Sequence, residues 1–314
     1  MKEVKIAFAG LDNAGKTSFL IALRKKYNFF EFVKELVPTK LIEFNAFNFL
    51  NQYNINIWDM GGQEKYRRLY VKNLVYFEET DFLYYMIDIQ DKEKFEDSLN
   101  YLNKILAIYK DLGYKNDFYV CFSKFDPKIR NDPDYIKRRE GLAKCIQDRN
   151  PEMHFKFFDT SYYDISSLSK ALSHSLNQLL RLEALHNYIQ ALGKEFGCSY
   201  VILYSDSGLI ISDYYGDLFD SKDFEERISS KISEDLIFFQ ELQDKKAQFS
   251  ERTSFFNDQK EYVKKYTIDT ARGDIIFYLG ITTNNLKHLK IKKEFENFEV
   301  ELTKTFVKND VIEI

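Results

Sequence analysis

Cysteine, proline and glycine are scarce in this 314-residue chain, which holds three cysteines, four prolines and twelve glycines. The cysteines are far apart and odd in number, so they indicate neither a disulfide framework nor a cysteine-rich metal site. We therefore expect a reducing, cytoplasmic compartment. Because no run of about 18 apolar residues occurs, we expect no segment that spans a membrane.

Targeting signals are also missing at both ends of the sequence. The chain begins Met1-Lys2-Glu3, without an apolar signal region or a glycine at position 2, and its last four residues hold no cysteine for prenylation. We expect any membrane contact to come through a partner. The net charge of -4 gives no general attraction to nucleic acid or anionic lipid.

The first 180 residues alternate between strand-like and helix-like segments. Residues 82–88 are apolar throughout, as in a strand buried on both faces, and residues 92–112 carry apolar side chains at helical spacing. Such alternation predicts an α/β domain, a mainly parallel sheet with helices on both faces. The expected elements are strands at 4–9, 41–49, 53–58, 82–88, 118–122 and 155–158 and helices at 18–27, 92–112, 134–149 and 165–180.

The pattern changes near residue 181. Two short apolar runs separated by Ser205-Asp206-Ser207 predict a hairpin, and longer helical segments surround further strands. We expect an α+β domain over 181–314, an antiparallel sheet flanked by helices, closely coupled to the domain over 1–180. Its expected elements are helices at 182–196, 221–247 and 286–307 and strands at 200–204, 208–212, 262–270 and 274–281.

Residues 10–17 fit the pattern G-x-x-x-x-G-K-[ST] directly after a predicted strand. Backbone N–H groups in such a loop form a concave anion site, to which the following helix adds its N-terminal partial charge. Lys16 would reach the terminal phosphates and Thr17 would bind Mg²⁺. A plain glycine-containing turn is the alternative. We expect phosphate contacts from Gly10, Asp12, Asn13, Ala14, Gly15, Lys16, Thr17 and Ser18.

A second group of residues follows the strand at 53–58. Asp59 would hold Mg²⁺ through water, and Gly62 would let its backbone approach a γ-phosphate. Gln63 is then placed to orient an attacking water. Thr39, in a loop, would complete the metal shell beside Thr17, so that the loop senses whether the γ-phosphate is present.

The base is expected at the ends of the next strands. A carboxylate at Asp126 can accept the N1–H and 2-amino donors of guanine, a pair that adenine lacks. Taken alone, an aspartate in such a turn can also be a turn or helix cap. The expected base contacts are Ser123, Lys124 and Asp126, with Ser161 and Tyr162 near the guanine O6.

These motifs identify a resemblance to the small GTPases of the Ras superfamily over residues 1–180. Gly10 to Thr17, Pro38-Thr39 and Trp58 to Gln63 are similar to the Arf family. The rest of this half, and the run Ser199 to Tyr204 after it, resemble the Rag/Gtr family, whose C-terminal domain is of the roadblock/longin type. The resemblance implies a P-loop GTPase domain followed by a roadblock-like domain. Ser123 departs from the family pattern, which has asparagine there.

The resemblance implies a GTP-binding switch with bound GTP or GDP and Mg²⁺. Lys16 and Gln63 would act in slow hydrolysis, with an activating protein supplying the arginine that is not evident in this chain. An exchange factor and a homodimer or heterodimer through the C-terminal domain are further expectations, as is recruitment from the cytoplasm to a membrane by partners. The alternative is a scaffold that needs nucleotide for stability and hydrolyses little. An ATPase is disfavoured by Asp126.

Overall fold

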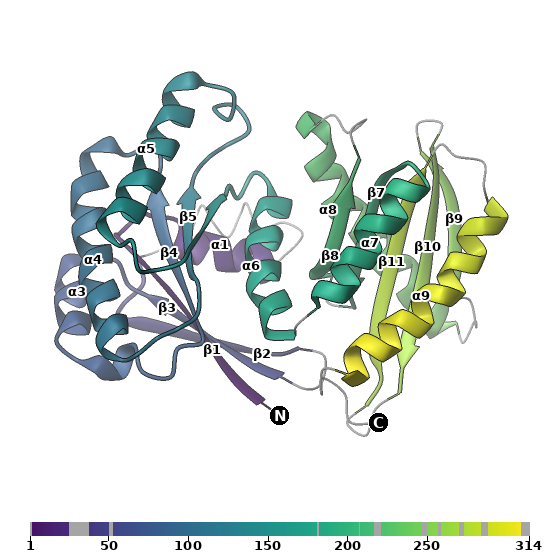
Figure 1. The fold of residues 1–314 in the computed structure, drawn as a ribbon, viewed down its shortest axis with the longest axis horizontal. Helices are drawn as coiled ribbons and strands as arrows, with labels where there is room; N and C mark the ends of the chain where they lie inside the picture. The colour runs from purple at the N-terminus through teal and green to yellow at the C-terminus, as the bar shows by residue number, and fades with distance from the viewer. Residues whose placement is uncertain are drawn as a thin grey trace. The chain divides into compact units, whose positions relative to one another are not determined.

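The computed structural model forms two compact units, shown in Figure 1. The first comprises Met1–Phe49 and Tyr53–Ala171, and the second Leu50–Gln52 and Leu172–Ile314. The division falls inside one helix, whereas the boundary predicted from the sequence lies at the end of that helix. The structure describes residues 2–24, 38–49, 53–180, 182–206, 208–216, 221–245, 250–256, 259–269, 273–283 and 288–308.

A six-stranded sheet of order β2-β3-β1-β4-β5-β6 forms the centre of the first unit. Only β2 runs antiparallel to its neighbour, so the predicted mainly parallel sheet is confirmed. The carboxyl ends of the five parallel strands therefore meet at one edge. The strands are β1 (Lys2–Gly10), β2 (Ile42–Phe49), β3 (Tyr53–Met60), β4 (Phe82–Asp88), β5 (Phe118–Ser123) and β6 (Phe155–Asp159).

Helices cover both faces of this sheet in Figure 1. Successive side chains of a buried strand point to opposite faces of the sheet. Tyr85 packs in the core that includes residues of α3, α4 and α5, whereas Tyr84 stacks on Phe8 beside Phe19 of α1. The helices are α1 (Lys16–Arg24), α3 (Glu64–Val71), α4 (Phe95–Asp111), α5 (Pro133–Arg149) and α6 (Ile165–Leu180), with 3₁₀ turns η1 (Leu74–Tyr76) and η2 (Lys92–Lys94). Helix α3 was not predicted, and the helix predicted at 92–112 is divided into η2 and α4.

The second unit is built on a five-stranded antiparallel sheet of order β8-β7-β11-β10-β9. Helix α8 lies on one face and α7 and α9 on the other (Figure 1). The predicted hairpin is present as β7 and β8, whereas β9 was not predicted. The elements are α7 (Glu183–Glu195), β7 (Cys198–Ser205), β8 (Ile210–Tyr215), α8 (Ser221–Asp244), β9 (Glu251–Phe256), β10 (Gln259–Ile268), β11 (Ile275–Thr283) and α9 (His288–Lys308).

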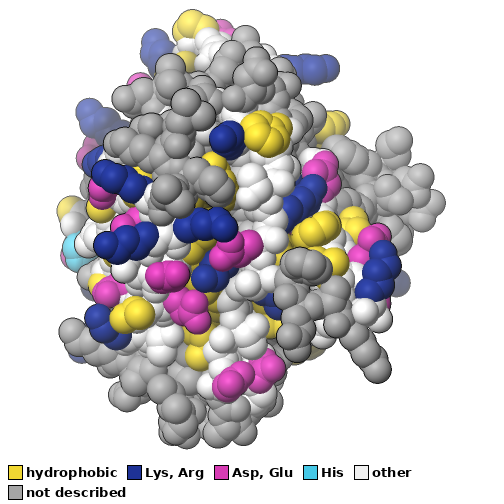
Figure 2. Space-filling view, turned by 90° about the vertical axis from the view of Figure 1, so that its right-hand side faces the viewer, with side chains coloured by type: hydrophobic (Ala, Val, Ile, Leu, Met, Phe, Trp, Pro, Cys, Tyr) yellow, Lys and Arg dark blue, Asp and Glu magenta, His cyan; other side chains and the backbone are white. Residues whose placement is uncertain are grey.

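Four predicted element ends lie outside the described residues, at 25–27, 246–247, 270 and 286–287. Within the described ranges, no helix is both long and apolar enough to cross a bilayer. On the face shown in Figure 2, the described Lys and Arg side chains are interspersed with Asp and Glu. This mixture agrees with the small net charge of the chain.

Candidate functional site

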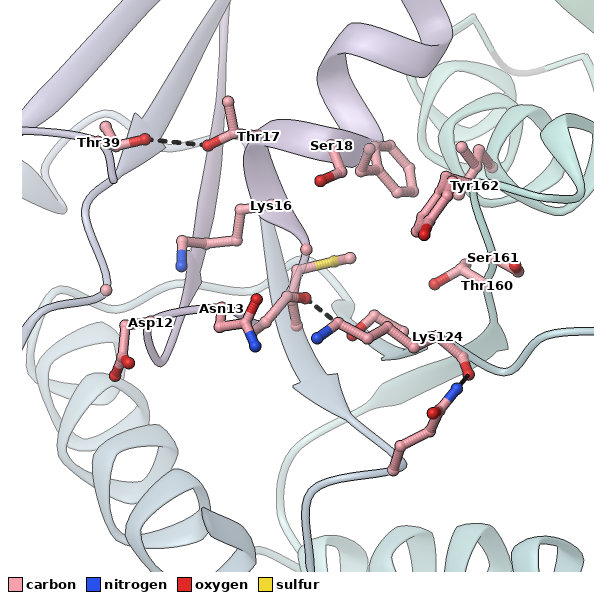
Figure 3. A pocket seen from close by; sticks show the side chains of 18 of the residues that line it. Asp12, Asn13, Lys16, Thr17, Ser18, Thr39, Lys124, Thr160, Ser161 and Tyr162 are labelled. Atoms are coloured by element: carbon pink, nitrogen blue, oxygen red, sulfur yellow. Dashed lines mark hydrogen bonds between the residues drawn. The ribbon is translucent and has the colours of Figure 1, made fainter. Parts of the chain in front are cut away.

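A cavity of about 590 Å³ opens at the carboxyl edge of the parallel sheet, where ligands of open α/β sheets bind. Figure 3 shows Asp12, Lys16 and Thr39 toward one end, and Lys124 and Ser161 toward the other. Gly10 and Asp59 are predicted site residues that do not line it. The structure brings together the remaining ones as lining residues: Asp12, Asn13, Ala14, Gly15, Lys16, Thr17, Ser18, Thr39, Gly62, Gln63, Ser123, Lys124, Asp126, Ser161 and Tyr162.

The loop between β1 and α1 depends on backbone conformations that most residues avoid. Gly10 has a φ of 143°, and a Cβ there would lie 2.5 Å from the Met86 carbonyl oxygen of the neighbouring strand. Asn13 adopts a left-handed φ of 61°. The close approach of β1 and β4 therefore requires a glycine at position 10. Gly10 shapes the phosphate loop although it does not line the cavity.

Lys16 is a buried cation. Its side chain is only 5% exposed, and its Nζ donates to the carbonyl oxygens of Leu11 at 2.7 Å and Gly10 at 3.2 Å. Burial lowers the pKa of Lys16 to about 8, against the opposing effect of Asp59 and Asp12. Within the described residues it forms no ion pair. An anion that can reach such a buried cation would stabilise it.

Two hydroxyls and a carboxylate converge beside it. The Oγ1 atoms of Thr17 and Thr39 lie 2.9 Å apart (Figure 3), and Thr17 Oγ1 donates to Asp59 Oδ2 at 2.5 Å. Asp59 is buried, which raises its pKa, and among the described residues its Oδ1 atom has no hydrogen-bond partner. Oxygen donors of this kind are what Mg²⁺ prefers. The three residues predicted as metal ligands therefore fit a magnesium ion.

In the parts of the chain that the structure describes, no group of three His, Cys, Asp or Glu side chains could hold a metal ion.

Gly62 lies against the phosphate loop. A Cβ at this position would stand 2.3 Å from the backbone of Leu11 and Asp12, so no other residue fits without displacing the loop. Gln63 follows as the N-cap residue of α3 and lines the cavity. The Gly62 carbonyl accepts a hydrogen bond of 2.8 Å from Arg67 Nε, a contact that the sequence reasoning missed.

Asp126 has a donor on each carboxylate oxygen. Ser161 Oγ donates to Oδ1 at 2.5 Å, and Gln90 Nε2 donates to Oδ2 at 3.1 Å and to the Lys124 carbonyl at 2.7 Å. Lys124 Nζ lies 2.7 Å from Asp88 Oδ2. A base with two donors would replace the Ser161 hydroxyl and the Gln90 amide as the hydrogen-bond donors to Asp126. Gln90 was missed, although its position just beyond a strand end was a usable signal.

Ser123 connects the two ends of the cavity. Its Oγ lies within hydrogen-bond distance of the Ala14 carbonyl, at 2.8 Å, and of the Ile87 carbonyl, at 3.1 Å. The serine that departs from the family pattern thus still braces the phosphate loop. By contrast, the Ser161 N–H, in the segment predicted to contact the guanine O6, donates to Ser167 Oγ at 3.1 Å.

Asp12 at the mouth of the loop is paired with Lys94, whose Nζ lies 3.1 Å from Asp12 Oδ2. Burial alone would raise the pKa of Asp12, but the hydrogen bond and charge of Lys94, together with a backbone hydrogen bond and the charge of Arg67, outweigh it and lower that pKa. The acidic charge is thus partly balanced, through a contact between segments that no sequence motif connects.

Comparison with known proteins gives the family. Residues 5–234, well over half of the chain, match the model described as the Gtr1/RagA G protein conserved region. ADP-ribosylation factor-like protein 2 of Dictyostelium discoideum is 40% identical over 178 residues, 56% of this chain and 83% of that protein. The Arabidopsis thaliana protein of that name is 30% identical over 163 residues, 52% of this chain and 80% of its own length.

Among solved structures, the Arl6 BBS3 small GTPase from Trypanosoma brucei with bound GppNp covers 57% of this chain and 99% of its own at 16% identity. Its TM-score of 0.44 is too low to bear on the assignment, which rests on the sequence matches. The chain belongs to the Gtr1/RagA family of G proteins, small GTPases of the Ras superfamily.

Proposed function

We propose that this small GTPase is a molecular switch that binds GTP with Mg²⁺ and hydrolyses it slowly to GDP and phosphate. The conformations of the segments around Thr39 and Gly62 would depend on which nucleotide is bound. The observation that carries the proposal is one cavity that has at one end a buried cation without an ion pair among the described residues, and at the other a carboxylate with two exchangeable donors. This arrangement suits a polyphosphate joined to a base with two adjacent donors.

The phosphate end would act through electrostatics and position. Lys16 and the loop N–H groups stabilise negative charge on the transferred phosphoryl group. Mg²⁺, held by Thr17, Thr39 and Asp59, supplies further neutralisation of that charge when bound. Gln63 orients the attacking water. In support of these roles, Lys16, Thr17, Thr39 and Gln63 line the cavity, and Asp59 accepts a hydrogen bond from Thr17.

Sensing of the γ-phosphate follows from two contacts. The Thr39 hydroxyl contacts both Thr17 and Asp59, so the Thr39 loop is tied to the metal corner. Gly62 lies against the phosphate loop, where loss of the γ-phosphate removes a partner for its N–H. Departure of phosphate would therefore release both segments.

The test is single-turnover hydrolysis of bound GTP by the wild type and by Gln63→Leu, with GTP affinity measured in Mg²⁺ and in EDTA. We expect the wild type to turn over at about 10⁻⁴ to 10⁻² s⁻¹. Gln63→Leu should reduce the rate about a hundredfold and leave GTP affinity within about twofold. EDTA should weaken GTP binding. Equal rates in the two proteins would remove Gln63 from this role.

A scaffold function through the second unit is the other candidate. Helix α8 directs Ile228, Ile232 and Phe239 into the core, yet Ile237 on the same helix is 55% exposed. A single exposed isoleucine is common on monomers, so the dimer is proposed from the family resemblance, and Ile237 marks the position on α8 at which to test it. Light scattering of the full chain would test it: Ile237→Asp should halve the mass of a dimer, and a monomeric wild type would exclude the homodimer.

A further inference from the structure

Arg67 joins the Gly62–Gln63 segment to the core of the first unit. Its Nε donates to the Gly62 carbonyl at 2.8 Å, and its backbone N–H donates to the Gln63 carbonyl at 3.0 Å. Its guanidinium carbon lies 5.2 Å from the ring centroid of Tyr101 in α4. One residue thus contacts two consecutive peptides beside the cavity and a ring behind them.

The Gly62 carbonyl matters because it belongs to the peptide that carries the Gln63 N–H. A hydrogen bond to that oxygen restrains rotation of the peptide and with it the direction in which Gln63 leaves the backbone. On the other side, Gly62 is held by the phosphate loop, where even a Cβ would stand 2.3 Å from Leu11 and Asp12. The peptide is fixed between the loop and Arg67.

Tyr101 provides a firm support for the guanidinium. Its side chain is 4% exposed and belongs to the core on the α4 face of the sheet. Burial raises the pKa of Tyr101 well above its usual value, so the ring stays neutral. A cation over an aromatic face is attracted to it, most strongly where water is excluded. Arg67 is therefore oriented by a residue that cannot easily move.

Among the described residues, Gln63 has few other contacts. It is the N-cap residue of α3, with an extended backbone (φ -62°, ψ 143°), and its side chain makes no capping hydrogen bond. Its carbonyl accepts from the N–H groups of Tyr66 and Arg67. The position of Gln63 thus depends on the first turn of α3 and on the Arg67 contact with Gly62.

We propose that Arg67 is a positioning residue for GTP hydrolysis: its guanidinium lies over the Tyr101 ring and donates to the Gly62 carbonyl, and this contact keeps Gln63 where it can orient the attacking water. This inference rests on the proposed switch function and on the role of Gln63 in it. A displacement of about 1 Å in a catalytic group can cost about a hundredfold in rate, so a backbone contact one turn away is enough to matter.

The experiment compares Arg67→Ala and Arg67→Lys with Arg68→Ala as the matched control. Arg68 is on the same helix, its side chain is 74% exposed, and it pairs with Glu64 in the same turn. Single-turnover hydrolysis and GTP affinity are measured for each. Arg67→Ala should reduce the rate about tenfold to a hundredfold with GTP affinity within about twofold, and Arg68→Ala should match the wild type.

Two further readouts separate positioning from folding. Lysine can donate to the Gly62 carbonyl but has no planar group to stack, so Arg67→Lys should recover part of the rate. In a Gln63→Leu background, Arg67→Ala should slow hydrolysis no further, because residues acting through one another are not additive. An equal loss in both backgrounds, or a fall in GTP affinity as large as the fall in rate, would overturn the proposal.

Failure of the inference differs from failure of the function on which it rests. A GTP-loaded wild type that never releases phosphate would refute the proposed hydrolysis, and the role of Arg67 with it. A wild type that hydrolyses GTP at the same rate as Arg67→Ala would refute the role of Arg67 alone.

Discussion

Both units bury charged side chains beside a sheet, but they pair them differently. In the second unit, Lys231 Nζ lies 2.7 Å from Glu261 Oε2 and 3.2 Å from Asp235 Oδ1, and Arg252 lies 2.8 Å from Asp235 Oδ1. The two carboxylates are only 2–3% exposed. Two cations thus face two anions, and their charges sum to zero.

The hydroxyls around that cluster complete the pairing. Tyr204 donates to Asp235 Oδ2, Tyr200 to Glu261 Oε1, and Ser254 to Glu261 Oε2. Every carboxylate oxygen therefore has a donor. Burial and the neighbouring charge of Glu261 still raise the pKa of Asp235 to about 6, against the opposing effect of Lys231 and Arg252.

In the first unit, two buried charges at the cavity, those of Lys16 and Asp59, are incompletely paired. Among the described residues, Lys16 donates only to backbone carbonyls, and Asp59 Oδ1 has no hydrogen-bond partner. A buried charge without a partner is costly and is kept where a ligand supplies what is missing. Both units bury charge, so burial does not distinguish the binding site from the structural cluster. Incomplete pairing of the buried charges does.

Lys231→Met should show the largest effect and would sharpen this contrast. It leaves two buried carboxylates facing one cation, and removal of one partner from a buried pair costs about 3–5 kcal/mol. We expect a loss of that size in the free energy of unfolding, measured in urea, with GTP affinity unchanged in the folded variant. A loss below about 1 kcal/mol, the value of an exposed pair, would contradict the structural role of the cluster.

Lys16→Met makes the same substitution in the first unit and should have the opposite effect on stability. The nucleotide-free variant should be more stable than the wild type, because a desolvated cation is removed. Its GTP affinity should fall about a hundredfold, as expected for loss of a buried charged contact. Urea unfolding and equilibrium GTP binding measure the two quantities. If Lys16→Met destabilised the nucleotide-free protein, the contrast between the units would fail.

The pH dependence of that stability difference is a smaller effect with a definite sign. The pKa of Lys16 is lowered from its usual 10.5 to about 8 in the folded protein. Above pH 8 the folded state loses this proton before the unfolded state does, so nucleotide-free wild type gains stability as pH rises toward 10.5. The advantage of Lys16→Met should shrink by about 2 kcal/mol between pH 7 and pH 9.5.

The measurement is the difference in free energy of unfolding between Lys16→Met and the wild type, obtained by urea unfolding of both proteins at each pH. Comparing the two cancels Lys5, whose pKa is also lowered to about 8 by burial. A difference that does not change with pH would mean that Lys16 is not desolvated in the folded protein.

The phosphate loop and the strand-end motifs could be predicted from the sequence because their spacing is fixed by local geometry and parallel strands end at one edge. The partners of Gln90 and Lys94 could not, since each contact joins segments far apart in the chain, and the Arg67 contact with Gly62 depends on the unpredicted helix α3. Helix α3 was missed because its eight residues make only about two turns, too few for a helical period to show, and β9 because it is a largely polar edge strand.

The buried cluster of the second unit was also missed. Lys231 and Asp235 are four residues apart on a long helix, a spacing that on an exposed face indicates a solvated pair. What the sequence does not reveal is that β10 places Glu261 against the same side chains.

The central claim, that this cavity selects a guanine nucleotide, is tested most directly by the ratio of GTP to XTP affinity in the wild type and in Asp126→Asn. Competition binding in Mg²⁺ gives the ratio. The wild type should prefer GTP, and Asp126→Asn should shift the preference toward XTP, because an amide can pair with the xanthine oxygen that replaces the 2-amino group. An unaltered GTP-to-XTP ratio in Asp126→Asn would contradict the claim.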